Sequence, residues 1–202
     1  MGGQIFVVSG SSGTGKTSLL QEVLAKDSRL RFSVSYTTRK PRPHEVHGQD
    51  YFFVSPDEFH RLVQQGRLIE WVEQFGHFYG TSKDWVDQAL TQEQDIVFDI
   101  EIHGARQLKR LYPDETFIFI LPPSLAELER RLRRRGDVPE AELQQRLQQA
   151  RKELQEVEWY DYLVINDDFS EAVYLLQALV NASRCRTPLV WPKIKHRFQI
   201  QS

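Results

Sequence analysis

Residues 5–24 read IFVVSGSSGTGKTSLLQEVL, and the fold can be predicted outward from them. A short apolar run at 5–8 ends at a glycine-rich turn, and a helix pattern begins near Ser18. The turn at 10–17 matches G-x-x-x-x-G-K-[ST], a loop whose backbone N–H groups surround a phosphate at a helix N-terminus. The alternative, an ordinary Gly/Ser turn, needs neither all the fixed positions nor both flanking elements. The stretch therefore predicts a strand, a phosphate-binding loop and a helix, in that order.

The side chains of this loop have predictable roles around a nucleoside triphosphate. Lys16 would reach the β- and γ-phosphates, and the Thr17 hydroxyl would ligate Mg²⁺. Asp99 ends a later apolar run, where P-loop proteins place an acid near the metal, whereas an isolated Asp there is more often a cap or turn residue. We expect Mg²⁺ at Thr17 and Asp99. We expect the triphosphate at Gly10, Ser11, Ser12, Gly13, Thr14, Gly15, Lys16, Thr17 and Ser18.

Three further apolar runs lie at 96–98, 116–121 and 162–165. All four runs are continuous rather than alternating, as in strands that are buried on both faces of a parallel sheet between helices. The pattern predicts an α/β fold, a P-loop three-layer sandwich with a central parallel sheet. With 40% hydrophobic residues among 202, the chain has enough apolar side chains for the core of such a domain.

Two segments interrupt this pattern. Residues 33–80 are rich in Tyr, Phe, Thr and charged residues, and we expect short strands, turns and one helix that starts after Ser55, with a capping box to Glu58. The second segment starts with another capping box, from Ser124 to Glu127. That box begins a helix with Leu125, Leu128 and Leu132 on one face. A second helix follows at once, too short for a coiled coil, so we expect it to pack on its own domain. Its apolar residues are spaced four and three apart, at Leu143, Leu147, Ala150, Leu154 and Val157.

Charge and cysteine content exclude several classes of protein. The formal net charge is −2, which gives no global basic field for nucleic acid or an anionic membrane. The single cysteine, Cys185, has no partner for an internal disulfide, and we expect a buried or half-buried thiol in a reducing compartment. The sequence has neither a basic leader nor a run of about 18 apolar residues. We expect a cytoplasmic protein that neither crosses a membrane nor binds nucleic acid.

A second anion site is predicted in the segment 35–45, SYTTRKPRPHE. Arg39 and Arg42 present planar forks that match phosphate oxygens, and the two prolines limit the conformational entropy of the loop. Tyr51 and Tyr79 can add hydroxyl donors, so the set would clamp one monophosphate. A short basic loop is more often simply solvated, and this segment alone leaves both interpretations open.

This region resembles the GMP-binding region of the guanylate kinase family. Family members carry, in order, segments of the form S-x-T-T-R-x-P-R-x-x-E, D-Y-x-F, I-E-W and Y-G-T/S. The chain matches them at residues 35–45, 50–53, 69–71 and 79–81. Four ordered matches are far harder to obtain by chance than one, and the resemblance extends over residues 4–184.

The resemblance implies transfer of the γ-phosphate of ATP to GMP, assisted by Mg²⁺. It places GMP at Ser35, Arg39, Arg42, Glu45, Tyr51, Glu70, Tyr79, Thr81, Asp99 and Glu101. Glu70 has the chemistry to select guanine, because a carboxylate accepts from both N1–H and the exocyclic amine, whereas adenine offers no such pair. By itself, a Glu on a strand is more often an exposed charge.

The same resemblance implies an arginine lid that closes over the triphosphate, formed by Arg131, Arg135 and Arg146. We expect the other arginines of this cluster to be solvated, namely Arg130, Arg133 and Arg134. Asn166 and Asp167 resemble the segment near the adenine, although a polar loop with an N-cap explains Asp167 and Asp168 equally well. The catalytic residues would be Lys16, Arg42, Arg135 and Arg146.

Domain boundaries follow from these assignments. We expect a P-loop core at 4–32, 83–124 and 158–184, a GMP-binding insertion at 33–82, a helical lid at 125–157 and a C-terminal extension at 185–202. The chain departs from the family pattern, which has Gly, Asp and Gln at the positions of His44, Glu101 and His103. Three alternatives stay open: a ribose bisphosphate kinase, a non-catalytic interaction module of this fold, and a P-loop switch that hydrolyses ATP or GTP. A monomer and a homodimer fit the sequence equally well.

Overall fold

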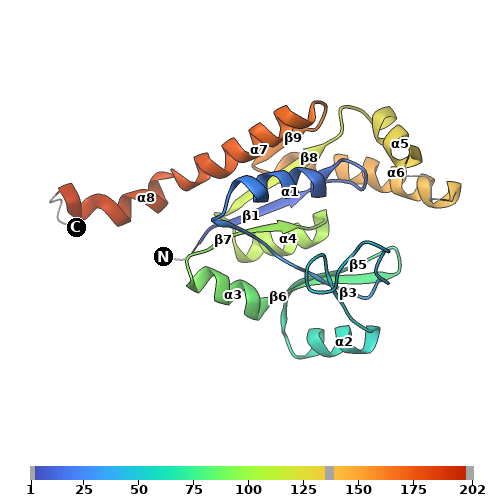
Figure 1. The fold of residues 1–202 in the computed structure, drawn as a ribbon, viewed down its shortest axis with the longest axis horizontal. Helices are drawn as coiled ribbons and strands as arrows, with labels where there is room; N and C mark the ends of the chain where they lie inside the picture. Colours follow the sequence, from blue (N-terminus) through green and yellow to red (C-terminus); the bar gives the residue numbers. More distant parts are fainter. Residues whose placement is uncertain (1–2, 135–138, 199–202) are drawn as a thin grey trace.

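A parallel five-stranded sheet forms the centre of the computed structural model, which describes residues 3–134 and 139–198 (Figure 1). The strand order is β2-β7-β1-β8-β9, and every neighbouring pair is parallel. The strands are β2 (Leu30–Phe32), β7 (Asp95–Asp99), β1 (Ile5–Ser9), β8 (Thr116–Leu121) and β9 (Tyr162–Ile165). Because β1 is the middle strand, the loop that follows it lies centrally at the carboxyl edge of the sheet, where α/β proteins bind ligands.

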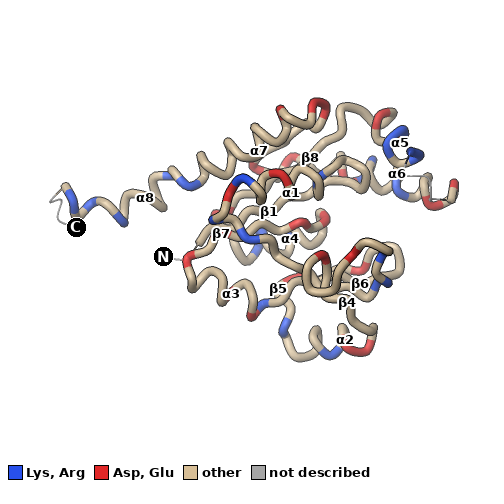
Figure 2. The backbone as a smooth tube through the Cα atoms, in the orientation of Figure 1, with Lys and Arg blue, Asp and Glu red and all other residues tan. Residues whose placement is uncertain are grey.

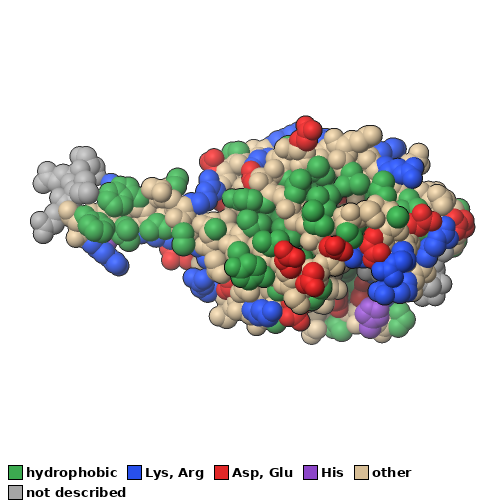
Figure 3. All heavy atoms as spheres, turned by 90° about the horizontal axis from the view of Figure 1, so that it is seen from above, with side chains coloured by type: hydrophobic (Ala, Val, Ile, Leu, Met, Phe, Trp, Pro, Cys, Tyr) green, Lys and Arg blue, Asp and Glu red, His purple; other side chains and the backbone are tan. Residues whose placement is uncertain are grey.

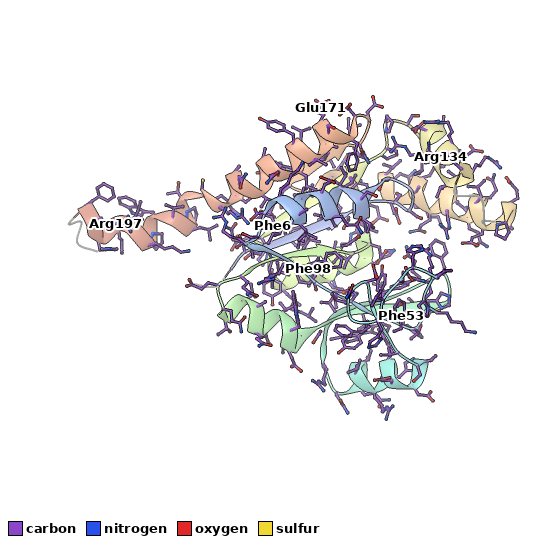
Figure 4. The ribbon with its side chains drawn as sticks, viewed as in Figure 1. Phe6, Phe53, Phe98, Arg134, Glu171 and Arg197 are labelled. Atoms are coloured by element: carbon purple, nitrogen blue, oxygen red, sulfur yellow. The ribbon has the colours of Figure 1, made fainter. Side chains whose placement is uncertain are left out.

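Helices cover both faces of this sheet and form the three predicted layers. One face carries α1 (Lys16–Lys26) and α7 (Phe169–Arg184), and the other carries α3 (Lys83–Thr91) and α4 (Ile102–Leu111). Alternate residues of β1 serve the two cores, since Phe6 and Val8 face the first pair of helices and Ile5 and Val7 face the second. Phe6 and Phe98, labelled in Figure 4, are fully buried in the sheet. The α/β prediction is confirmed.

The two edge strands differ from what the sequence predicts. β9 has a neighbour on one side only, and Tyr162, Leu163 and Ile165 are 42%, 50% and 55% exposed. The prediction that this run is buried on both faces is therefore wrong. In the part of the chain that the structure describes, β9 is the last strand of the sheet, so no further strand covers its outer side. β2, with the sequence Leu-Arg-Phe, has no continuous apolar run that would predict a strand.

A second, four-stranded sheet carries the insertion between β2 and α3 (Figure 1). Its order is β4-β3-β6-β5, with β3 parallel to β4 and antiparallel to β6. The helix α2 (Pro56–Gln64) starts after Ser55, whose side chain accepts from the Glu58 N–H at 3.1 Å, as the capping signal predicts. The strands are β3 (Tyr36–Thr37), β4 (Phe52–Phe53), β5 (Leu68–Gln74) and β6 (His77–Ser82).

Two helices beyond the main sheet, α5 (Leu125–Arg134) and α6 (Glu140–Leu154), have a small core of their own. Leu128 and Leu132 of α5 pack in one cluster with Leu143 of α6. Ser124 caps α5 by accepting from the Glu127 N–H at 3.1 Å. The helix with apolar residues spaced four and three apart thus packs within its own domain, as expected. Figure 2 shows that Lys and Arg gather on α5, and Figure 4 labels Arg134 at its end.

The C-terminal segment forms an arm that projects from the body (Figures 1 and 3). It consists of α8 (Thr187–Ile194) and a 3₁₀ turn, η2 (Lys195–Phe198); another such turn, η1 (Val157–Trp159), precedes β9. The Trp191 and Phe198 rings stack with their centroids 5.8 Å apart. Cys185 is exposed where α7 ends, so the expectation of a buried or half-buried thiol is wrong. None of the helices in the described residues is long and apolar enough to cross a membrane.

Candidate active site

The P-loop connects β1 to α1 and presents its backbone at the N-terminus of α1. Gly13 and Gly15 have φ angles of 95° and 88°, which glycine adopts far more readily than other residues. Gly15 also has no room for a side chain, because a Cβ there would lie 2.5 Å from Asn166 Nδ2. All residues of the predicted triphosphate loop, 10–18, line one large cavity. The glycines of the motif thus serve both the backbone conformation and close packing.

Lys16, Thr17 and Asp99 meet at the end of β7. Lys16 Nζ lies 2.6 Å from Asp99 Oδ1, and Thr17 Oγ1 donates to Asp99 Oδ2 at 3.0 Å. Lys16 Nζ also donates to the Ile100 carbonyl at 3.3 Å. The contact arises because β1 and β7 are paired, so an acid at the end of β7 reaches the loop after β1. The two residues predicted to hold Mg²⁺ are therefore in direct contact.

Asn166 supports the P-loop from behind and is not part of the cavity lining. It is 5% exposed, and its Nδ2 donates to the Thr14 carbonyl at 2.6 Å. The backbone carbonyl of Asn166 accepts from Arg131 Nη2 at 3.0 Å. Asp167 is exposed, and Asp168 caps α7 by accepting from a backbone N–H at 2.8 Å. The cap interpretation therefore holds for Asp168, while an adenine contact for Asn166 and Asp167 stays a prediction.

Ser35, Glu70 and Thr81 form a buried cluster, although they come from three segments. Glu70 on β5 and Thr81 on β6 are direct partners in the antiparallel register, and Ser35 precedes β3 on the other side of β6. The Thr81 hydroxyl donates to Glu70 Oε1 at 2.7 Å, and the Ser35 and Thr81 hydroxyl oxygens are 3.4 Å apart. Because Thr81 has one hydroxyl proton, Ser35 is the donor in the second pair. The predicted base-reading residues are thus assembled in one place.

The environment of Glu70 changes its acidity. Burial raises the pKa of its carboxyl to about 7; the hydrogen bond from Thr81 opposes this shift, and the charge of Glu101 adds to it. Glu70 is 3% exposed and still lines the cavity. A buried carboxyl that titrates near neutrality beside a cavity is typical of a functional site.

Arg39 and Arg42 are held by one carboxylate, that of Glu45. Arg39 Nη1 and Nη2 donate to Glu45 Oε2 and Oε1 at 2.9 and 2.8 Å, and the Arg42 backbone N–H donates to Oε2 at 2.7 Å. The Arg39 guanidinium lies 5.4 Å from the centre of the Tyr51 ring, which meets the Tyr79 ring edge to face. Burial raises the pKa of Tyr51, so its hydroxyl remains a donor. All five side chains line the same cavity, and Glu45 orients the two arginines.

Arg146 is the predicted lid arginine that lines the cavity. Its Nη1 donates to Ser12 Oγ at 3.1 Å, and its Nη2 lies 2.5 Å from Glu142 Oε1. Arg131 pairs with an acid of its own helix and is not part of the lining, while Arg135 lies outside the described residues. The three arginines expected in solvent are exposed, namely Arg130, Arg133 and Arg134.

Glu101 lines the cavity and also caps α4, where its Oε1 accepts from the Gly104 N–H at 3.0 Å. Burial raises the pKa of the Glu101 carboxyl, and the charge of His103 and two backbone N–H donors oppose that shift. One oxygen is thus committed to the helix cap. A contact from Glu101 to GMP stays a prediction.

These elements surround a single space of about 1250 Å³. Sites for one small ligand usually occupy about 300–1,000 Å³. The P-loop, the clamp of Arg39 and Arg42, Glu70 and the α6 residue Arg146 all line this space. It therefore has room for two nucleotides at once.

Residues 2–183 match the family model described as guanylate kinase. The chain belongs to the guanylate kinase family. The guanylate kinases of Geobacter metallireducens and Thermotoga maritima are 45% and 40% identical to it, over 98% and 100% of this chain and 98% and 97% of theirs. The crystal structure of guanylate kinase from Anaplasma phagocytophilum superposes with a TM-score of 0.82 at 30% identity, covering 100% of this chain and 98% of that one.

Two residues that line the site of this guanylate kinase family member are not apparent from its sequence. Glu153 on α6 is 5% exposed and accepts from the Ser11 hydroxyl of the P-loop at 2.5 Å. In the sequence, Glu153 could have been noticed only as a charged residue beside the apolar stripe of α6. Phe75, at the turn between β5 and β6, lies with its ring centre 5.8 Å from the Arg146 guanidinium. In the sequence, the pair Phe75-Gly76 between two apolar segments could have indicated a turn that exposes Phe75.

Proposed function

We propose that the protein transfers the γ-phosphate of ATP to GMP, giving ADP and GDP. The observation that carries this proposal is the shared cavity, because the P-loop, the arginine clamp and Glu70 all line it. ATP would bind with its phosphates on the P-loop. GMP would bind with its phosphate at Arg39 and Arg42 and its base at Glu70.

The reaction needs no general base. A GMP phosphate is already an anion at neutral pH, so one of its oxygens attacks the γ-phosphorus directly. The new O–P bond forms as the bond from the γ-phosphorus to the bridging oxygen breaks, and ADP leaves with that electron pair. Catalysis then rests on in-line positioning and on neutralising the negative charge of two phosphorylated substrates.

Among the described residues, each Lys and Arg that lines the cavity is paired with a carboxylate. Lys16 pairs with Asp99, Arg39 with Glu45, and Arg146 with an acid of its own helix. We infer that phosphate oxygens take the place of a carboxylate at Lys16 and Arg146, while Glu45 continues to orient Arg39. This exchange keeps the cations positioned before the substrates arrive, which lowers the cost of reorganisation.

Thr17 and Asp99 fit the requirements of Mg²⁺, which is bound with nucleotide phosphates by one or two protein oxygens and several waters. Mg²⁺ would neutralise charge on the β- and γ-phosphates.

The predicted domain division also remains part of the proposal. We infer that the insertion at 33–82 and the lid at 125–157 move against the core and close over both substrates. The separate small core of α5 and α6 supports a lid that moves as a unit. Closure would exclude water from the γ-phosphate. The exposed single cysteine suits a reducing compartment, so we propose a cytoplasmic location.

The test is ADP formation from ATP and Mg²⁺ with GMP, dGMP, AMP, CMP, UMP or a ribose bisphosphate as acceptor. We expect GMP to exceed AMP by several orders of magnitude in kcat/KM, because adenine offers no pair of N–H donors to the buried Glu70 carboxylate, which would keep only its hydrogen bond from Thr81. ADP release at one rate with every acceptor, or with none, would point to the hydrolytic switch. A preference for a ribose bisphosphate would point to the sugar kinase instead.

The KM for GMP should depend on pH through Glu70. The carboxyl must be ionised to accept both guanine donors, and its pKa is about 7. We expect the KM for GMP to rise about tenfold for each pH unit below neutrality and to be flat above it. The Glu70→Gln variant is the reference, since it keeps only the titration of the GMP phosphate, whose second pKa is about 6. Parallel profiles for the two proteins would contradict this role of the carboxyl.

Replacing Asn166 by alanine should weaken ATP binding, because Asn166 supports the backbone of the P-loop without contacting the cavity. The Thr14 carbonyl would lose its partner, and we expect the free energy of unfolding to fall by about 1–3 kcal/mol. The KM for ATP should rise about tenfold, which corresponds to about 1.4 kcal/mol of binding. Asp168→Ala is the matched control, because it removes a helix cap worth about 1 kcal/mol without touching the loop. Equal KM values for ATP in both variants would rule out a specific support by Asn166.

A further inference from the structure

Gly104 lies in the first turn of α4, where its lack of a side chain needs an explanation. Glycine destabilises a helix interior relative to alanine, and Gly104 has no positive φ that would require it. Its position is buried. A Cβ built on Gly104 would lie 2.6 Å from Glu70 Oε2 and 3.4 Å from Glu70 Cδ. The space that alanine would fill is therefore occupied by the Glu70 carboxylate.

Neither side of this contact is free to move away. Gln107, one turn after Gly104, fixes α4 to β5, because its Nε2 donates to the Trp71 carbonyl at 2.8 Å and its Oε1 accepts from the Trp71 N–H at 3.3 Å. Trp71 is the residue next to Glu70 in β5. Within α4, Ile102, Ala105 and Leu108 are buried in the core beneath the main sheet. The helix and the strand are thus held at a fixed spacing.

Glu70 is held from its other side as well. The Thr81 hydroxyl donates to Oε1, while Oε2 lies against the first turn of α4. At 3% exposure the carboxylate can move only toward the cavity that it lines, and that movement would break its hydrogen bond from Thr81. The position of the carboxylate is therefore set by the hydrogen bond from Thr81 on β6 and by the absence of a side chain at Gly104, whose Cβ site Oε2 occupies.

We infer that Gly104 is a specificity-determining position, which keeps both oxygens of Glu70 where guanine can donate to them. Gly104 does not touch the base; it acts through Glu70 and is a positioning residue. The inference rests on the proposed function, in which Glu70 reads guanine, and it adds that the first turn of α4 determines how Glu70 is placed.

The Gly104→Ala variant tests this inference. The methyl group forces Glu70 away from Thr81, so we expect the KM for GMP to rise at least tenfold. The KM for ATP should be unchanged, and kcat at saturating GMP should stay within about twofold. The melting temperature should fall, whereas alanine in an open helix position would raise it. Arg110→Ala, an exposed change on the same helix, is the control and should leave the KM for GMP at the wild-type value.

A second comparison makes the assignment specific to Glu70. In a Glu70→Ala background the carboxylate is gone, so adding Gly104→Ala should have no further effect on kcat/KM for GMP and should raise the melting temperature. If Gly104→Ala alone fails to fold, recovery of folding in the double variant supports the inference, and failure of both overturns it.

The failure of this inference is distinguishable from the failure of the proposed function. A Gly104→Ala variant with wild-type KM for GMP and a raised melting temperature would overturn the role of Gly104. If Glu70→Gln itself leaves GMP kinetics unchanged, the base-reading role of Glu70 falls, whatever the result at Gly104.

Discussion

Lys16→Ala should lower kcat at least about a thousandfold, the scale on which cations at a transferring phosphoryl group act. The reason is geometric as well as electrostatic. Lys16 is the one P-loop side chain of this site that carries a positive charge, and it lies beside Asp99 at the end of β7. In the transition state negative charge spreads over the oxygens of the γ-phosphoryl group, and the ammonium of Lys16 is the positive charge that the P-loop itself supplies there.

This variant has a clear set of controls. Asp99 keeps its hydrogen bond from Thr17, so we expect the protein to fold and to melt cooperatively. The Kd for GMP, measured by calorimetry, should change less than about twofold, because Lys16 belongs to the triphosphate side of the cavity. Lys16→Met, which keeps the apolar stem, should be as inactive as Lys16→Ala. A kcat within tenfold of the wild type in either variant would contradict the role of Lys16.

Glu70→Gln should lower kcat/KM for GMP about a thousandfold, because a site built around hydrogen bonds rejects a mismatched partner strongly. The Thr81 hydroxyl donates to Oε1, so an amide at position 70 is oriented with its oxygen toward Thr81. Its NH₂ group then takes the place of Oε2 and faces the N–H donors of guanine. Two donors confront each other where the wild type has a donor and an acceptor.

The matched control for this change is Glu73→Gln on the same strand. Glu73 is exposed, and its substitution should leave kcat/KM for GMP at the wild-type value. The KM for ATP should be unchanged in both variants. If Glu70→Gln and Glu73→Gln have equal kinetics with GMP, Glu70 does not read the base.

Glu70→Gln has a second readout in the absence of nucleotides. The folded-state pKa of Glu70 is raised from 4.5 to about 7. A carboxyl with a raised pKa contributes stability below its unfolded-state pKa, and that contribution is lost as the pH rises through the folded-state value. The variant should therefore be more stable than the wild type at about pH 8, and this advantage should vanish near pH 4.

The sequence predicted those parts of the molecule that depend on local pattern. The strand, loop and helix around Lys16 follow from one motif, and three of the four apolar runs are strands buried in the sheet interior. The caps at Ser55 and Ser124 follow from residues three positions apart. These signals are short in sequence, so no knowledge of the tertiary structure was needed.

Local sequence patterns do not predict contacts between segments that lie far apart in the chain. Asn166 meets the P-loop across 152 residues and Glu153 across 142. The family resemblance places Asn166 near the adenine, but neither periodicity nor a motif predicts that either residue contacts the P-loop. The cluster of Ser35, Glu70 and Thr81 was expected through the family resemblance alone, because its assembly depends on the register of β3, β5 and β6. The edge position of β9 depends on strand order, which an apolar run does not encode.

Transfer of the γ-phosphate from ATP to GMP can be followed with a labelled phosphate. ATP carrying a radioactive γ-phosphate is incubated with Mg²⁺, GMP and the protein, and the products are separated by chromatography. We predict that the label appears in GDP in proportion to the ADP formed, with little inorganic phosphate when GMP is omitted. Label in inorganic phosphate at the same rate with and without GMP would contradict the account.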